Sequence, residues 1–496
     1  MAMTQMPNWL EKRARLTPER EAVIDEYGVR WSFQKLFEAA CAMAHTIQHL
    51  LPADGERVAV YAPNSFRYAA CVWALHDVHV QAVLLNTRLS VTELHKQLHD
   101  ADVSLLIFDE TLALAGKELT TLNEISSVCL QGLPLEMEQP EPVRSQWHLR
   151  DEVTMMFTSG TTGRAKGVRH TLGNHYYSAS GSVLNLGLHN DDRWLLMLPM
   201  FHVGGMSILY RGVLYGMPVH LLPRFDAEKA VEIVYEEKIT IMSAVAVMLD
   251  RMLDYVTEGY ELASIRSVVL GGGPASKTLL ERAAHLQVPV QQTYGMTETA
   301  AQFCTQDTAS KDTKAGTAGK PLFFSELKIV KDGQQAKPFE VGELVLFGPQ
   351  ITPGYFRRPE ANEKAFSADG WFYTGDLGWI DEDGDVYIAD RRSDMIISGG
   401  ENIYPAEVEG VLEAHPAVLE AGVAAQADEV YGEVPAAFIV VREAVSEEVV
   451  KSFCKEKLAG YKVPKTVIYC EELPRTAARK LKRHVLKERL QKGGQS

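Results

Sequence analysis

Residues 153–167 read Val-Thr-Met-Met-Phe-Thr-Ser-Gly-Thr-Thr-Gly-Arg-Ala-Lys-Gly, an apolar run followed at once by a loop rich in hydroxyls and glycines. The apolar run predicts a buried strand, so the loop should lie at the carboxyl end of a strand, where open α/β sheets bind ligands. Glycine lets backbone N–H groups approach a ligand closely, and Lys166 adds a positive charge. We therefore expect this loop to hold a polyphosphate rather than to be an ordinary surface loop.

The loop differs from the standard P-loop at both positions that flank its lysine. Ala165 precedes Lys166 where glycine is required, and Gly167 follows it where Ser or Thr would bind magnesium. The loop therefore indicates another class of nucleotide-binding protein. Its candidate phosphate ligands are Thr158, Ser159, Gly160, Thr161, Thr162, Gly163 and Lys166.

The composition limits the kind of protein. A chain of 496 residues is too long for one hydrophobic core, so two or more domains are expected. Its net charge of −15 gives an acidic surface that repels nucleic acid, so we do not expect DNA or RNA binding. Six scattered cysteines without a C-x-x-C pair argue against zinc and disulfides, and they suit a reducing cytoplasm.

Targeting and membrane segments are not expected either. The first residues include Glu11, Lys12 and Arg13 and lack the apolar run of a signal peptide. The longest uncharged stretch, residues 194–210, is interrupted by Pro199 and by a Gly-Gly pair. We expect it to be a buried core segment and not a membrane span.

Short apolar runs alternate with segments of helical period, such as residues 90–99, through the first two-thirds of the chain. This alternation predicts mostly parallel sheets with helices on both faces. The runs expected to be strands are residues 58–61, 82–85, 105–108, 153–157, 219–222, 239–242 and 268–270.

After residue 341 the pattern changes to β segments punctuated by Gly and Asp. Residues 342–347, 378–381 and 385–388 predict antiparallel hairpins. The last hundred residues predict a smaller unit with its own strand at 436–441 and helix at 446–458. A helix should begin at Pro405, which suits a first turn, and end before Pro416.

Five further motifs follow the glycine-rich loop in a fixed order. This ordered set resembles the adenylate-forming superfamily of acyl-CoA synthetases, luciferases and nonribosomal-peptide adenylation domains, over almost the whole chain. The motifs are Gly271-Gly272-Gly273-Pro274, Tyr294-Gly295-Met296-Thr297-Glu298-Thr299, Tyr373-Thr374-Gly375-Asp376, Asp390-Arg391-Arg392-Ser393-Asp394 leading to Ser398-Gly399-Gly400-Glu401-Asn402, and Pro474-Arg475 before Lys480.

The resemblance implies an α/β fold with two domains. The large N-terminal domain, residues 1–390, would contain mostly parallel sheets flanked by helices and a distorted β-barrel subdomain. The small α+β domain, residues 391–496, would be mobile and rotate about a hinge near 390–394. The position that matches the hinge residue is Ser393, where relatives often carry Asp or Lys.

The resemblance also implies a two-step reaction. A carboxylate first joins the α-phosphorus of ATP and expels pyrophosphate, and a thiol then attacks the acyl-adenylate. ATP, Mg²⁺ and coenzyme A are the expected cofactors and co-substrates. Lys166 and the loop hydroxyls would hold the β- and γ-phosphates, and Lys480 would stabilise the charge that develops during adenylation.

The remaining motif residues would complete the nucleotide and thiol sites. Thr297 would contact the α-phosphate, and Glu298 would bind Mg²⁺. Residues 271–274 and 294–296 would form the adenine slot, with Tyr294 as its aromatic face. Ribose would bind Asp376, with Arg391 nearby, while Gly399, Gly400 and Glu401 would line the pantetheine tunnel. Taken singly, each residue also has an ordinary interpretation: a turn, a helix start or a solvated charge.

A finer resemblance concerns the acid substrate. Residues 7–10, 82–87, 173–176, 192–194 and 398–407 resemble the family of 2-succinylbenzoate–CoA ligases, which act in menaquinone biosynthesis. Such an aromatic dicarboxylate requires flat apolar walls and a cation for its second carboxylate. His202 after Phe201 would border the acyl pocket, and Arg211 is the candidate cation, although a surface helix arginine is an equal alternative. Ser207 and His175 are further candidates.

Three other functions remain open. The chain could be a CoA ligase for another aryl or medium-chain acid, a module that loads a carrier protein, or a nucleotide-binding protein without catalysis. Lys166, Glu298, Asp376 and Lys480 argue against the last of these. The expected partners are therefore the small-molecule acid, ATP and CoA, with a homo-oligomer possible.

Overall fold

The computed structural model describes residues 5–53, 55–158, 165–257, 262–273, 275, 277–307, 314, 316–390, 395–474, 481 and 483–493. Nine residues of the predicted site lie outside this part of the chain. They are Ser159, Gly160, Thr161, Thr162, Gly163, Pro274, Arg391, Ser393 and Lys480.

The first sheet has six strands, in the order β10-β9-β5-β4-β6-β7. All neighbours pair in parallel except β10, which returns antiparallel beside β9. The predicted runs 58–61, 82–85, 105–108 and 153–157 are confirmed as strands to within one residue at each end. The strands and their surrounding helices are β4 (Arg57–Tyr61), β5 (Gln81–Leu84), β6 (Leu105–Phe108), β7 (Ser126–Cys129), β9 (Glu152–Thr158), β10 (Lys166–Thr171), α2 (Phe33–Leu50), α3 (Phe66–Asp77), α4 (Val91–Ala101) and α5 (Ala113–Asn123).

The second sheet has nine strands, in the order β17-β16-β15-β14-β13-β11-β12-β2-β3. Its central strands are parallel, and antiparallel pairs close both edges. The strands are β2 (Glu21–Ile24), β3 (Arg30–Ser32), β11 (Trp194–Leu196), β12 (Val219–Leu221), β13 (Ile241–Ala244), β14 (Ser267–Leu270), β15 (Val290–Met296), β16 (Ala301–Thr305) and β17 (Lys320–Pro321). The associated helices are α1 (Trp9–Leu16), α6 (Leu172–Leu186), α7 (Val203–Tyr215), α8 (Ala227–Glu237), α9 (Ala246–Leu253) and α10 (Lys277–His285).

The uncharged stretch 194–210 is a core segment, as predicted. It forms β11 and the first half of α7, and Trp194, Met206 and Tyr210 are buried. Within the described ranges, no helix has both the length and the apolar character needed to cross a membrane. The expected strand at 239–242 is displaced along the chain to Ile241–Ala244, because the Ile239 N–H still donates to the Val234 carbonyl at the end of α8.

The third sheet is antiparallel and contains the three predicted hairpin segments, in the order β19-β18-β20-β21-β22. Its elements are β18 (Glu326–Lys331), β19 (Gln334–Gln335), β20 (Gly342–Phe347), β21 (Phe372–Ile380), β22 (Val386–Asp390) and the neighbouring helix α11 (Pro359–Ala365). The expected barrel is not traced as a closed ring by the pairing of the described strands. The sheet does curve toward the second one, since Ala318 N–H donates to the Val386 carbonyl and Val386 N–H donates to Gly319.

The C-terminal part has a sheet and a core of its own. Its elements are β23 (Ile396–Ser398), β24 (Glu401–Ile403), β25 (Val418–Asp428), β26 (Gly432–Val441), β27 (Thr466–Tyr469), α12 (Pro405–Glu413), α13 (Glu447–Lys455) and α14 (Arg483–Gly493). The predicted helix at Pro405 ends before Pro416, and the predicted strand 436–441 belongs to β26. The domain boundary near 390–394 stays a prediction, because residues 391–394 lie outside the described part.

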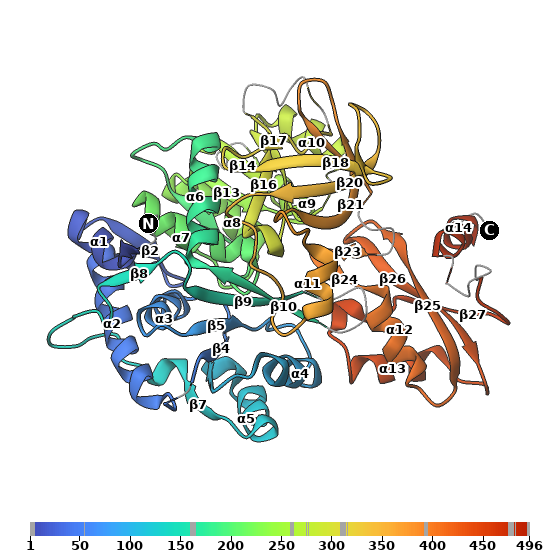
Figure 1. Cartoon of the computed structure of the whole chain (residues 1–496), viewed down its shortest axis with the longest axis horizontal. Coiled ribbons are helices and arrows are strands. Elements are labelled where there is room, and N and C mark those ends of the chain that lie inside the picture. The colour runs from blue at the N-terminus through green and yellow to red at the C-terminus, as the bar shows by residue number, and fades with distance from the viewer. Residues whose placement is uncertain are drawn as a thin grey trace.

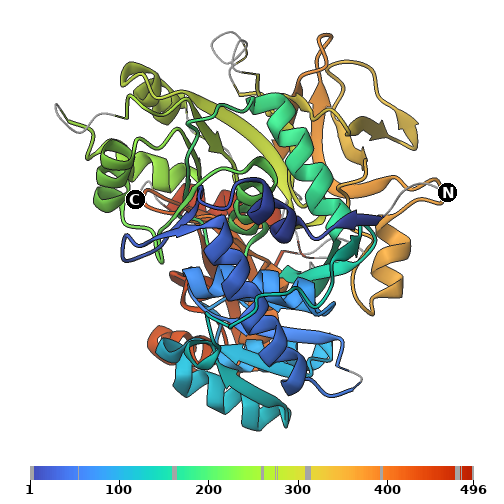
Figure 2. The ribbon, with the colours of Figure 1, turned by 90° about the vertical axis from the view of Figure 1, so that its left-hand side faces the viewer.

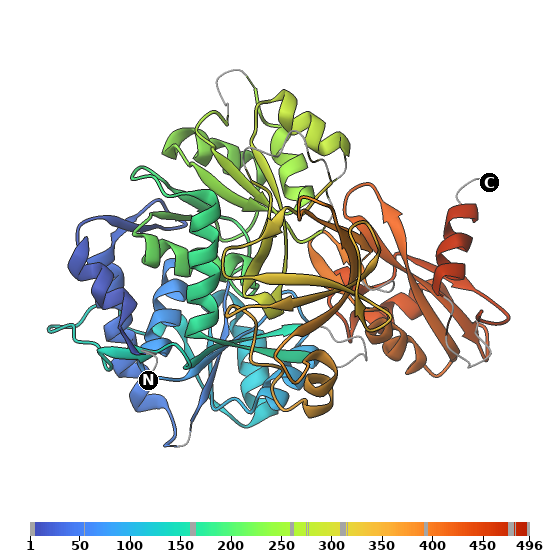
Figure 3. The same cartoon turned by 45° about the horizontal axis from the view of Figure 1, so that its top comes forward.

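The views show how these parts are arranged. The C-terminal part, orange to red, lies to one side of the N-terminal sheets (Figure 1), and behind them when the blue helices face the viewer (Figure 2). The yellow-to-orange third sheet lies next to both the green helices and the C-terminal part (Figure 3). A small sheet of β1 (Gln5–Pro7) and β8 (Gln146–His148) completes the N-terminal side.

Candidate active site

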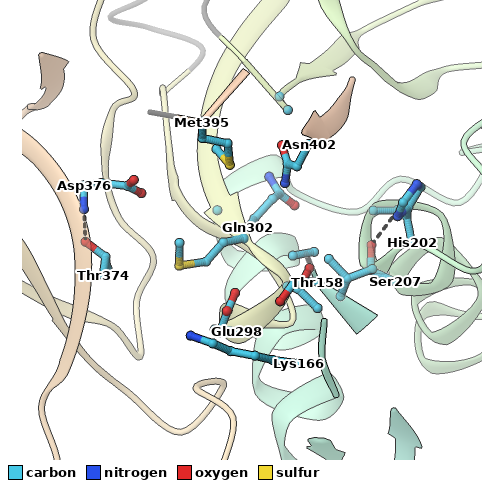
Figure 4. Close-up of a pocket in the computed structure, with 18 of the residues that line it drawn as sticks. Thr158, Lys166, His202, Ser207, Glu298, Gln302, Thr374, Asp376, Met395 and Asn402 are labelled. Atoms are coloured by element: carbon cyan, nitrogen blue, oxygen red, sulfur yellow. Dashed lines mark hydrogen bonds between the residues drawn. The ribbon is translucent and has the colours of Figure 1, made fainter. Parts of the chain in front are cut away.

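A cavity of about 910 Å³ opens at the carboxyl ends of the parallel strands of the second sheet. The third sheet contributes Thr374 and Asp376 to its wall, and the C-terminal part contributes Met395, Gly400, Asn402 and Tyr404. Parallel strands place the loops that follow them at a single edge, which is why motifs far apart in sequence meet here. Figure 4 shows their side chains around one space.

Lys166, Glu298 and Thr158 lie close together at one end of the cavity (Figure 4). Thr297, which precedes Glu298, also lines the cavity. Lys166 Nζ lies 4.7 Å from the centre of the Tyr355 ring, and the Tyr355 hydroxyl donates to Glu298 Oε1 at 2.9 Å. Burial raises the pKa of Glu298, although Tyr355 and Lys166 act in the opposite direction. A buried carboxylate beside a lysine is suited to a site that receives both a cation and phosphate groups.

Magnesium fits this end of the cavity. No group of three His, Cys, Asp or Glu side chains that could hold a metal occurs among the described residues. A hard divalent ion here would therefore take Glu298 as its protein ligand and complete its shell with phosphate oxygens and water, which is the usual preference of Mg²⁺.

The turn that carries Thr297 and Glu298 is set by a bulge in β15. The register with β16 shifts between Tyr294 and Gly295, and a Cβ at Gly295 would lie 1.9 Å from the Ala301 carbonyl oxygen. Only glycine permits this approach. The single helical turn η3 (Thr297–Thr299) follows, and His170 Nε2 lies 2.6 Å from the Thr297 carbonyl oxygen. No motif in the sequence predicted this support from His170.

Backbone forms one wall of the predicted nucleoside slot. Gly271 and Gly272 line the cavity, whereas Gly273 does not. Gly272 has a φ of +78°, and a Cβ at Gly271 would lie 2.9 Å from Thr293 Cγ2. A flat surface without side chains can therefore accept a planar ring.

Tyr294 does not have the position that was expected of it. The residue is buried and is not part of the cavity wall, and its hydroxyl donates to Asp376 Oδ2 at 2.7 Å. In this structure the ring supports the carboxylate of Asp376 rather than forming an aromatic face of the slot. Asp376 itself lines the cavity, as a ribose ligand would.

Helix α7 forms the opposite end of the cavity, where Leu198, Val203, Ala244 and Val269 provide apolar walls. The helix can start close to the preceding loop because residue 205 is glycine: a Cβ there would lie 2.2 Å from the Pro199 carbonyl oxygen. Ser207 and Arg211 follow on the same helical face and both line the cavity.

Arg211 is buried, with 1 % of its surface exposed. Its Cζ lies 5.0 Å from the centre of the Trp194 ring, and its Nε and Nη2 have no hydrogen-bond partner within the described part of the chain. Burial lowers the pKa of Arg211, but a guanidinium stays charged. A buried cation with unsatisfied donors costs folding free energy unless a ligand accepts its hydrogen bonds. Of the two interpretations of Arg211, the surface helix arginine is therefore wrong.

His175 is not part of the cavity wall. Its ring stacks on Tyr210 at 3.9 Å, and its Nε2 lies 2.9 Å from Thr154 Oγ1. Burial holds the pKa of His175 well below its usual value, so the ring is neutral. In this structure His175 packs against Tyr210 of α7 and lies outside the lining of the cavity.

A second cavity, of about 950 Å³, lies between α4 and the C-terminal part. It meets the first cavity at Thr158, His202, Thr297, Gly400 and Asn402, which line both. A narrow ligand could thus reach the first cavity from this side. Gly400 has a φ of +88°, and Gly399, with a φ of +57°, precedes it without lining either cavity.

Glu401 lies at this junction and is paired across the two parts of the chain. Its carboxylate is 3.1 Å from His202 Nε2 and 2.6 Å from Arg88 Nη1. Burial alone would raise the pKa of Glu401, but His202, Arg88 and Lys462 together lower it to about 2. Glu401 is therefore ionised, and it orients His202 at the meeting point of the cavities.

The structure thus brings together most of the predicted site residues that it describes. The members that line a cavity are Thr158, Lys166, His202, Ser207, Arg211, Gly271, Gly272, Gly295, Met296, Thr297, Glu298, Asp376, Gly400 and Glu401. Tyr355, Gln302 and Arg88 were missed, because none of them belongs to a recognisable motif. Their roles in binding, like those of the predicted residues, remain predictions.

Comparison with known proteins gives the family. The chain belongs to the AMP-binding enzyme family: residues 10–356 match the model of the AMP-binding enzyme, and residues 407–480 match that of the AMP-binding enzyme C-terminal domain. It is similar to a 2-succinylbenzoate–CoA ligase of Geobacillus sp. (strain WCH70), with 47% identity over 98% of both chains. A ligase of the same name from Bacillus thuringiensis subsp. konkukian is 45% identical, over 98% of this chain and 99% of the relative.

Solved structures of the o-succinylbenzoate CoA synthetase from Bacillus subtilis have the same fold. A double mutant bound to the product analogue OSB-NCoA aligns with a TM-score of 0.93, at 43% identity over 98% of this chain and 99% of that chain. The complex with the acyl-adenylate OSB-AMP aligns with a TM-score of 0.75, at 42% identity and the same coverage. The TM-scores differ although the identities are nearly the same and the coverage is equal, so the two solved structures differ in conformation.

Proposed function

We propose that this chain is an AMP-forming acid–thiol ligase that joins 2-succinylbenzoate to coenzyme A through an acyl-adenylate, in menaquinone biosynthesis. Membership of the AMP-binding enzyme family supports the reaction class. Similarity to 2-succinylbenzoate–CoA ligases and to the o-succinylbenzoate CoA synthetase supports the acid. Within the site, one observation carries the choice of acid: a buried arginine with unsatisfied donors lies at the apolar end of the cavity.

The first half-reaction activates the carboxylate. An oxygen of the substrate carboxylate attacks the α-phosphorus of ATP, the bond to the bridging oxygen breaks, and pyrophosphate leaves. Lys166 and the hydroxyl of Thr158 would hold the outer phosphates, and Thr297 the α-phosphate. Magnesium bound at Glu298 would neutralise phosphate charge, and Lys480 would stabilise the charge that develops on the transferred group.

The second half-reaction forms the thioester. The sulfur of CoA attacks the acyl carbon, the bond to the adenylate oxygen breaks, and AMP leaves with the electron pair. The junction of the two cavities at His202 and Gly400 offers the thiol a path from the second cavity to the acyl group. Glu401 holds His202 in place there.

Arg211 would select the acid. The carboxylate that is not activated would accept hydrogen bonds from Nε and Nη2 of the guanidinium, which are otherwise unsatisfied. The apolar residues around it would contact the aromatic ring. Such charge-assisted pairs give specificity as well as affinity in a buried site.

The cellular setting is also part of the proposal. The six cysteines are free, which suits the reducing cytoplasm. The ligands we propose are the acid, ATP, Mg²⁺ and CoA, and nothing in the site calls for nucleic acid.

The experiment incubates the chain with ATP, Mg²⁺, CoA and one acid at a time, and measures the CoA thioester and AMP by mass spectrometry. The panel contains 2-succinylbenzoate, benzoate, a benzoate with an uncharged side chain, and a medium-chain fatty acid. We expect equal amounts of thioester and AMP with 2-succinylbenzoate and little with the monoacids. Preferred turnover of another acid, or AMP without thioester, would overturn the proposal.

A further inference from the structure

A group of three charged residues, two of them buried and Glu407 partly buried, joins α4 to the C-terminal part. Lys462 Nζ lies 2.7 Å from Glu93 Oε1 and 2.8 Å from Glu407 Oε1, and Lys462 is 4 % exposed. Glu93 belongs to α4, whereas Lys462 ends the turn η4 (Gly460–Lys462) and Glu407 lies on α12. We name this group the charge bridge.

The charge bridge is the buried part of a longer contact between the two parts of the chain. The Ser90 hydroxyl oxygen lies 3.2 Å from the Lys457 carbonyl oxygen, and Arg88 pairs with Glu401. Arg88 is about half exposed, so screening weakens its pair. Lys462 is enclosed and held by two carboxylates, so the removal of one partner here costs more free energy than the removal of a partner from the exposed pair.

The bridge can open without leaving an isolated charge. Lys462 and Glu407 belong to the same part of the chain and stay paired when the two parts separate. Glu93 keeps its other oxygen on the N-cap of α4, where Oε2 accepts from the Ser90 N–H at 3.0 Å and from the Ser90 hydroxyl at 2.8 Å. A buried ion pair with alternative partners on both sides is suited to forming and breaking in each cycle.

The bridge also borders the second cavity. Glu93, Glu407 and Lys462 all line it, and Glu401 lines it beside His202. The structure of this chain aligns with the complex of the product analogue at a TM-score of 0.93. With the acyl-adenylate complex the TM-score is 0.75. The bridge thus belongs to the arrangement in which α4 and the C-terminal part enclose a route to the first cavity.

On the basis of the proposed function, we infer that Glu93, Lys462 and Glu407 are positioning residues for thioester formation. They hold the C-terminal part against α4 while CoA reacts, and they have no role in adenylate formation. The carboxylates of the bridge do not touch the reacting atoms; they act through the width of the second cavity and the placement of Glu401 against His202.

The test separates the two half-reactions in the full chain. Adenylate formation is measured by exchange of pyrophosphate into ATP in the presence of 2-succinylbenzoate, and thioester formation by single turnover of the preformed adenylate with CoA. For Lys462→Met we expect unchanged exchange and a thioester rate lower by roughly 10²-fold, because two buried carboxylates lose their cation. The KM for CoA should change less than the rate.

Three variants control for other causes. Glu93→Gln keeps a side chain able to cap α4 and should also slow only the second step, by roughly tenfold. Lys462→Arg should restore most of the rate, since it keeps the charge. Lys451→Met removes a lysine that pairs with Glu447 on its own helix, and should leave both steps unchanged.

Equal loss in both half-reactions for Lys462→Met and Glu93→Gln would overturn the inference, as would no loss in either. If Lys462→Met does not fold, Glu93→Gln decides alone. If the wild-type chain forms no thioester from 2-succinylbenzoate, the proposed function is wrong. If the wild type is active and the variants are unaffected, only the inferred role of the charge bridge is wrong.

Discussion

A single side chain, Arg211, decides how the acyl end of the cavity is interpreted. A guanidinium inside an apolar wall, with Nε and Nη2 unpaired, costs stability that folding alone does not recover. Stacking on Trp194 compensates part of this cost. The rest is explained if a substrate carboxylate completes the hydrogen bonds.

We predict that Arg211→Leu raises the KM for 2-succinylbenzoate by roughly 10²-fold, because one partner of a buried charge pair is removed. Turnover of a benzoate with an uncharged side chain should rise relative to wild type, since the apolar wall is kept. Steady-state thioester formation with both acids measures this change. An unchanged preference for the dicarboxylate would contradict the role of Arg211.

Motifs predicted which residues meet, but residue type alone did not predict their orientation. The cavity collects Lys166, Thr297, Glu298 and Asp376 from three separate motifs. Tyr294 was expected in the wall and lies behind it, because the bulge at Gly295 changes which side chains face the cavity. For Arg211 a signal did exist, since Ser207 and Arg211 are four residues apart and so share a helical face.

At the scale of the elements, buried neutral histidines join several strands and helices. His76 of α3 bonds to Tyr210 of α7, and His170 of β10 and His175 of α6 meet at Thr154 of β9. Burial lowers the pKa of His76 to about 3 and that of His170 to about 4. His220 of β12 is buried as well, and its pKa is also lowered to about 4.

These pKa shifts predict that acid destabilises the fold. In the unfolded chain the histidines bind protons below about pH 6.5, whereas in the folded chain they do so only near pH 4 or lower. The unfolded state therefore binds more protons between these limits. The free energy of unfolding should fall as the pH drops through this window, by roughly 1 kcal/mol per pH unit for each histidine.

Urea unfolding at pH 7.5 and pH 5.5 measures the effect. His220→Gln should lessen the loss of stability on acidification, because one titrating group is removed. His99→Gln replaces an exposed histidine and should keep the wild-type dependence. A stability that is equal at both pH values would contradict the prediction.

Strands in the core were the easiest elements to predict from the sequence. Apolar runs bounded by turns marked β4, β5, β6 and β9, since a strand buried on both faces needs no alternation. β25 (Val418–Asp428) was missed because its residues favour a strand only weakly. Its ten pairs with β26 stabilise it, and such tertiary pairing is not visible in local sequence.

For the whole molecule, we propose that one site serves both half-reactions by a change in the arrangement of its parts. The structure places Gly400, Asn402 and Tyr404 of the C-terminal part against the first cavity. After Lys480, Leu481 packs near Gly422 of β25, and Arg483 pairs with Glu409 of α12. Leu481 and Arg483 thus contact the C-terminal part itself. The order of the sheets and the placement of this part could not be predicted from the sequence.

Substitution of Lys480 tests whether a lysine of the C-terminal part activates a carboxylate held with ATP in the first cavity. For Lys480→Ala, we expect adenylate formation to slow by roughly 10²–10³-fold, whereas the reaction of supplied acyl-adenylate with CoA should stay close to that of wild type. Lys482→Ala, two residues away, is the matched control and should retain both rates. If Lys480→Ala forms the adenylate at the wild-type rate, Lys480 does not activate the carboxylate and the proposed mechanism is wrong.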